Sequence, residues 1–178
     1  MNKGYLSIVL HAHLPYVRHP EHPYSLEEKW FFEAITECYL PLINSMNKLH
    51  EEGREFKITI SLSPTLLSML DDNYLQDKYI VYLEKLLELA EKEVKRTKSD
   101  KDFHPLALMY QVQLGDIYHS FRDKYKKNLI NAFRDLYFKG VVDLITCNAT
   151  HGYLPLLGIS REAVYAQIKV AVDTFIKK

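Results

Sequence analysis

Three short segments with strand-forming composition, separated by long helical patterns, constrain the fold of this chain more than any other feature. They are GYLSIVL (residues 4–10), FKITISL (56–62) and VVDLITC (141–147). Residues 4–10 are apolar almost throughout, a pattern typical of a strand that is covered on both faces. The order of strand, helix, strand, helices, strand and helix predicts an α/β fold with a parallel sheet and right-handed crossovers.

Serine caps and prolines predict where several helices begin or bend. Ser25 and Glu28 have the spacing of a capping box, and the helix that follows is expected to run to Gly53. Pro41 should kink that helix or split it in two. Ser63 with Pro64 marks the start of the next helix, and Ser160 can cap the last one.

The longest helical patterns lie between the second and third strands. One apolar stripe spans residues 75–94, and a second helical stretch spans about residues 105–137. We expect the two to form an antiparallel helical excursion covering about residues 74–137. The chain of 178 residues is 47% hydrophobic and 26% charged, which suits one domain, residues 1–178.

The charge balance excludes two classes of partner. Lysine and arginine number 23, as do aspartate and glutamate, so no net field favours nucleic acid or an anionic membrane. No apolar run has the length of a membrane span or a signal-peptide core. Cys38 and Cys147 form no CxxC pair, so they indicate neither zinc nor a disulfide framework, and we predict a reducing, cytoplasmic location.

Histidines follow two of the predicted strands. His11 and His13 follow the first strand, and His151 follows the third. Ligands of parallel α/β folds bind beyond the carboxyl ends of the strands, so the three imidazoles are expected to converge. They could be ligands of one divalent cation in a metal-dependent hydrolase, or hydrogen-bonding groups for sugar hydroxyls with carboxylates as catalysts. A purely structural role for at least one histidine is a third interpretation.

The segments around these histidines carry a family resemblance. KGYLSIVLHAHLPYVRHPE, KWFFEAITECYLPLI, ITISLSPTLLSML and ITCNATHGYLPLL occur in this order over nearly the whole chain. Together they resemble the N-terminal part of glycoside hydrolase family 57, of the 1,4-alpha-glucan branching enzyme and alpha-amylase types. HAHLPYV and ATHGYLPLL are the most specific of these segments, whereas an HxH pair alone is not specific.

The resemblance implies a fold and a set of sugar-binding residues. It implies the N-terminal portion of a (β/α)7 barrel, with about three parallel strands, long helical insertions and no barrel closure in this chain. In the family, the histidines that correspond to His11 and His151 lie in the donor-sugar subsite. His13 belongs to the same motif and either contacts sugar or braces the pocket. Trp30 could wall the cleft or be a core tryptophan, and Glu37 could lie near the pocket or on the surface.

The segments that carry the family's reacting carboxylates are not found in this sequence. A retaining glycosidase needs two carboxyl groups roughly 5 Å apart. Glu33 and Glu37 lie on a helix flank, and Asp143 lies inside the third strand, so they are not expected to replace the pair. We therefore expect a chain that binds alpha-1,4-glucan or maltooligosaccharide, needs no metal or cofactor, and is inactive alone.

Two further expectations concern partners and alternatives. An open sheet edge invites a complementary C-terminal chain or self-association. A metal-dependent hydrolase using His11, His13 and His151 and a noncatalytic carbohydrate-binding subunit are the alternative functions.

Overall fold

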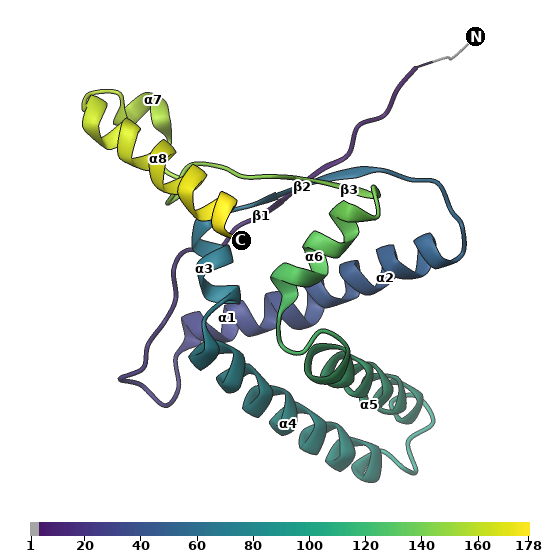
Figure 1. Cartoon of the computed structure of the whole chain (residues 1–178). Helices are drawn as coiled ribbons and strands as arrows, with labels where there is room; N and C mark the ends of the chain where they lie inside the picture. The colour runs from purple at the N-terminus through teal and green to yellow at the C-terminus, as the bar shows by residue number, and fades with distance from the viewer. Residues whose placement is uncertain (1–3) are drawn as a thin grey trace.

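A computed structural model describes residues 4–178 of the chain (Figure 1). Three parallel strands lie side by side in the order β1, β2, β3, and helices connect them. The elements in chain order are β1 Val9–Ala12, α1 Leu26–Ala34, the π-helix η1 Ile35–Tyr39, α2 Leu40–Glu51, β2 Ile58–Leu62, α3 Pro64–Leu70, α4 Asn73–Arg96, α5 His104–His119, the π-helix η2 Ser120–Lys124, α6 Leu129–Phe138, β3 Val142–Ile145, α7 Leu154–Leu157 and α8 Arg161–Lys177.

The two faces of the sheet have different surroundings. In Figure 1, helices α1 to α6 lie on one side of the strands. The side chains on this covered face come from Leu10, Ile60 and Leu144, which are in register. Ile60 belongs to the hydrophobic core, and the partly buried Leu10 and Leu144 pack against it. The alternate residues form the opposite face, which we call the bare face. It consists of Val9, His11, Thr59, Ser61, Asp143 and Ile145.

The bare face corrects the expectation that the first strand is covered on both faces. Val9 is 58% exposed, and Ile8 and Leu6 just before it are also exposed. Among residues 4–178, β1 is an edge strand that pairs with β2 alone, and no helix lies over its second face. Residues 4–9 are therefore exposed despite their apolar sequence, and Leu10 alone of this segment packs against the core.

Three predicted helix starts are confirmed. The side chains of Ser25, Ser63 and Ser160 accept hydrogen bonds from the backbone N–H groups of Glu28, Leu66 and Ala163. The Glu28 carboxylate does not complete the capping box. It is buried, accepts a hydrogen bond from the backbone N–H of His19 at 2.8 Å, and forms an ion pair with Lys78. This glutamate therefore ties the β1–α1 loop to α4.

The effect of Pro41 is a local widening of the helix. The π-helix η1 ends two residues before Pro41 and joins α1 to α2. A proline has no N–H and clashes with the carbonyl four residues earlier, so a wider turn there lets the helix continue. The helix ends near Gly53, as predicted, where a positive φ of 70° suits glycine.

The helical stretch predicted over about residues 105–137 is wrong as a single helix. It breaks after η2, where Lys126 and Lys127 have positive φ angles of 51° and 65°. Asn128 then caps α6 by accepting a hydrogen bond from the N–H of Asn131. Leu106 and Tyr110, in the first half of α5, are about half exposed, because only the second half of this helix reaches the core.

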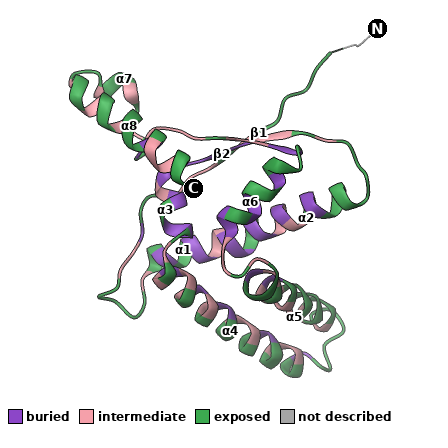
Figure 2. Ribbon diagram, viewed as in Figure 1, coloured by how far each residue is buried: buried purple, intermediate pink, exposed green. Residues whose placement is uncertain are grey.

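Aromatic side chains join the helices below the sheet. Tyr79 of α4 is fully buried and meets Phe121 of η2 edge to face, with ring centroids 4.7 Å apart. Its hydroxyl lies 2.9 Å from the hydroxyl of Thr36 in η1. Figure 2 shows buried residues on the inward sides of α1, α2, α3 and α6, while α8 is largely exposed. Among residues 4–178, no helix is both long and apolar enough to cross a membrane.

Candidate functional site

The three predicted histidines meet at the carboxyl ends of β1 and β3. The ring of His151 lies 4.5 Å from that of His11 and 4.5 Å from that of His13, measured between centroids. The rings of His11 and His13 are 6.0 Å apart. His11 and His151 are exposed and His13 is half-buried. The predicted convergence is confirmed, and the cluster is open to solvent on one side.

A tight turn after β3 positions His151. Its φ angle is 55°, in the left-handed region that residues other than glycine rarely adopt. The Asn148 carbonyl accepts a hydrogen bond from the His151 N–H at 3.1 Å, and the Asn148 amide donates to the carbonyl of Gly152. The side-chain amide of Gln167 in α8 holds the adjacent Thr150: it accepts a hydrogen bond from the Thr150 N–H and donates one to the Thr150 hydroxyl. Strained backbone that is held from several sides is typical of functional sites.

His11 and His13 are held by the sheet and by α3. His11 is opposite Ser61 in the register of β1 and β2. The Thr65 hydroxyl of α3 donates to the carbonyl of Leu14 at 2.8 Å and lies 3.5 Å from Nδ1 of His13. The chain after β1 is therefore fixed to the first turn of α3, and His13 is the least exposed of the three histidines.

The environment favours neutral imidazoles at two positions. Desolvation and, secondly, repulsion from His151 lower the pKa of His11. Desolvation also lowers the pKa of His13, with smaller contributions from His151 and His11. A neutral imidazole has one ring nitrogen that donates and one that accepts, so it can bond a sugar hydroxyl or ligate a metal ion.

A cysteine that sequence reasoning passed over belongs to this cluster. One ligand atom each from His11, Cys147 and His151 lie within 4.8 Å of one another. Cys147 is half-buried, and burial raises the pKa of its thiol. The sequence signal was present, because Cys147 ends the same strand segment that leads to His151. It was missed because only CxxC spacing was considered.

Within the described part of the chain, Trp30, Glu33, Glu37 and Asp143 have no hydrogen bond, ion pair or ring contact with the three histidines. Trp30 is in α1 and is 49% exposed, and among the described residues no ring contact joins it to the three histidines. Glu37 is exposed in η1, and Glu33 pairs with Lys29 at 3.2 Å. Asp143 is on the bare face, where Lys57 pairs with it at 3.0 Å.

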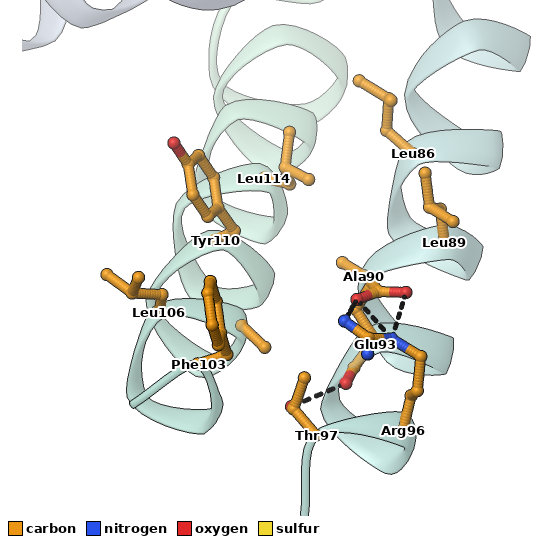
Figure 3. A pocket seen from close by; sticks show the side chains of 11 residues that line it. Leu86, Leu89, Ala90, Glu93, Arg96, Thr97, Phe103, Leu106, Tyr110 and Leu114 are labelled. Carbon is orange, nitrogen blue, oxygen red and sulfur yellow. Dashed lines mark hydrogen bonds and ion pairs between the residues drawn. The ribbon is translucent and has the colours of Figure 1, made fainter. Parts of the chain in front are cut away.

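A hollow between α4 and α5 has the wrong chemistry for a sugar site (Figure 3). It has a volume of about 410 Å³ and walls of aliphatic and aromatic side chains, among them Leu89, Phe103 and Leu114. The charged groups beside it, Glu93 and Arg96, bond each other at 2.7 Å. Sugar hydroxyls need several convergent polar groups, so the histidine cluster remains the candidate site.

Comparison with known proteins finds one family over nearly the whole chain. The family model of glycosyl hydrolase family 57 matches residues 7–178. A 1,4-alpha-glucan branching enzyme of Thermococcus kodakarensis is 39% identical over 176 residues, which are 98% of this chain and 25% of the relative. The solved structure of the alpha-amylase AmyC of Thermotoga maritima superposes with a TM-score of 0.91 and 44% identity, covering 96% of this chain and 32% of AmyC. The structure of a branching enzyme of Pyrococcus horikoshii also superposes with a TM-score of 0.91, at 38% identity, covering 99% of this chain and 32% of that enzyme.

The coverage explains the open sheet. The chain spans a quarter to a third of the length of these relatives and corresponds to the N-terminal portion of their (β/α)7 barrel. The three parallel strands with one bare face are what such a portion leaves exposed. The chain belongs to glycosyl hydrolase family 57.

Proposed function

We propose that this chain supplies the donor-sugar half of an alpha-1,4-glucan site. The observation that carries the proposal is the contact between His11, His13 and His151 at the carboxyl ends of the strands, in a chain of glycosyl hydrolase family 57. Branching enzymes and an alpha-amylase are its relatives, which supports a glucan as the ligand. His11 and His151 bond sugar hydroxyls in this proposal. His13 braces the pocket from the side of Thr65. The half-exposed Trp30 of α1 lines the approach to the pocket in this proposal.

The proposal does not include catalysis by the chain alone. The carboxylates Glu33 and Asp143 are engaged by Lys29 and Lys57, and Glu37 is in a different element from the histidines. A retaining double displacement needs a nucleophile and a general acid/base on either side of the scissile bond. We propose that a complementary C-terminal chain provides both and docks against the bare face, with self-association as its competitor. Exposed apolar residues beside that face, Leu6, Ile8 and Val9, suit such docking.

Titration with maltohexaose tests the half-site. Trp30 is the single tryptophan, so its fluorescence reports on sugar near α1, and calorimetry measures the affinity independently. We expect a dissociation constant of about 1 to 10 mM, since only part of a cleft is present. His151→Ala or His11→Ala should weaken binding more than about tenfold, which is about 1.4 kcal/mol.

The control for these variants is His50→Ala, which removes an exposed histidine at the end of α2. It should leave the affinity for maltohexaose unchanged. Equal affinity in the wild type, His11→Ala and His151→Ala would contradict the half-site.

An activity assay distinguishes an enzyme portion from a noncatalytic binding subunit. The chain alone should neither branch nor hydrolyse amylose. Co-expression with a chain that carries the remaining strands of a family 57 barrel should restore activity, and His151→Ala should reduce it. Sugar binding without a complex and without restored activity would favour the binding subunit.

A further inference from the structure

The cluster that holds the histidines also contains a donor set for a thiophilic metal ion. One ligand atom from each of His11, Cys147 and His151 lies within 4.8 Å of the other two. A tetrahedral zinc ion separates imidazole nitrogens and a thiolate sulfur by about 3.3 to 3.6 Å, from its bond lengths to nitrogen and sulfur. Small rotations of the side chains would therefore bring the three atoms onto one ion.

The surroundings allow that rotation while keeping the backbone in place. His11 and His151 are exposed, so their rings have room to turn. The backbone on each side of Cys147 is fixed, because the Thr146 hydroxyl donates to the carbonyl of Leu62 at 2.8 Å and Asn148 holds the following turn. A site whose backbone is already ordered loses less entropy when the ligand binds.

The donor types select among metal ions. Two imidazole nitrogens and one thiolate are typical zinc ligands, whereas magnesium, calcium and manganese prefer carboxylate and carbonyl oxygens. Within residues 4–178, this cluster contains no carboxylate. Its fourth position is within reach of His13, whose ring lies 4.5 Å from that of His151. A water molecule could fill it instead.

We propose that His11, Cys147 and His151 bind one zinc-class cation. This site shares His11 and His151 with the metal-hydrolase alternative, but it adds Cys147 as a ligand and assigns no hydrolytic step to the ion. The imidazoles would bind the ion through neutral ring nitrogens and the cysteine through its thiolate, so an ion that binds the sulfur displaces the thiol proton.

Zinc and cobalt titrations of the purified, metal-stripped chain test the site without any sugar present. Zinc, measured by competition with a chromophoric chelator, should bind at one ion per chain. Cobalt should give the visible absorption of a tetrahedral ion and a sulfur-to-cobalt charge-transfer band. His11→Ala and His151→Ala should each weaken zinc binding more than about tenfold, as loss of a ligand requires. Cys147→Ser should abolish the charge-transfer band and weaken zinc binding.

Two matched variants and a folding measurement keep the test decisive. Cys38→Ser removes the other cysteine, which is exposed in η1, and His50→Ala removes a histidine outside the cluster. Both should bind zinc like the wild type. Circular dichroism and thermal unfolding without metal identify any variant that is misfolded, and His11→Gln replaces His11→Ala if the alanine variant fails.

Three results would overturn the proposal. They are absence of zinc binding by the folded wild type, equal losses in the cluster variants and the controls, and a charge-transfer band that survives Cys147→Ser. Each result would leave the sugar half-site untouched, because maltohexaose binding is measured separately and without metal.

Discussion

The two faces of the one sheet carry opposite chemistry although they are made by the same three strands. On the covered face, Ile60 is 1% exposed and lies in register with Leu10 and Leu144. On the bare face, Ile145 is 44% exposed and lies in the row of His11 and Ser61. Alternate residues of a strand point to opposite faces, so neighbours in sequence serve different purposes. The covered face stabilises the chain, and the bare face carries His11, one of the three histidines of the candidate site.

The comparison explains why apolar residues of the strands are exposed on the bare face. In a (β/α) barrel, the face turned away from the helices is the packed interior, and the ligand site lies at the carboxyl ends of the strands. The bare face here ends at the histidine cluster, in agreement with that geometry. Val9 and Ile145 are exposed in this chain although their aliphatic side chains are typical of a barrel interior.

The largest expected effect comes from truncating the same residue type on the two faces. Ile60→Ala should lower the free energy of unfolding by about 2 to 5 kcal/mol, because it removes buried methyl groups and leaves a cavity. Ile145→Ala should lower it by less than about 1 kcal/mol, because that side chain is already half in water. Urea unfolding of the two variants measures the difference. Equal losses would mean that the bare face is packed in solution, for example by self-association.

The caps and the convergence of the site could be predicted because each depends on local sequence. Ser25, Ser63 and Ser160 precede helical patterns, and a cap needs only the next three residues. His11 and His151 follow apolar strand segments, and the parallel topology brings such ends together.

The features that could not be predicted depend on contacts between distant residues. Burial of residues 4–10 depends on strands beyond this chain's three, so their apolar pattern suggested a cover that is missing here. The break at Lys126 and Lys127 separates η2 from α6, whose buried side packs into the core, and Asn128 was its local capping signal. The position of Trp30 relative to the histidines depends on how α1 packs, which a helical pattern does not specify.

A smaller effect is expected at the strained turn of the site. His151→Gly should raise the free energy of unfolding by up to about 1 kcal/mol, because glycine adopts the φ of 55° without the penalty that a side chain carries. The same variant should lose maltohexaose binding. Gly140→Ala is the converse control: its φ is 76° and a Cβ there would meet nothing within 4 Å, so strain alone should lower stability by about 1 kcal/mol. Destabilisation by His151→Gly would assign the imidazole a structural role instead.

The smallest effect on stability is expected at the open edge, where a change of charge should alter association. Val9→Lys places an ammonium group on the bare face of the edge strand, a means by which natural edges avoid pairing. The free energy of unfolding should change by less than about 0.5 kcal/mol, since Val9 is already 58% exposed. Sedimentation velocity over a concentration series should show the wild type associating and Val9→Lys remaining monomeric. Val112→Lys makes the same change at an exposed site on α5 and should associate like the wild type. If both lysine variants associate equally, the contact lies elsewhere, and the bare face is left for a complementary chain alone.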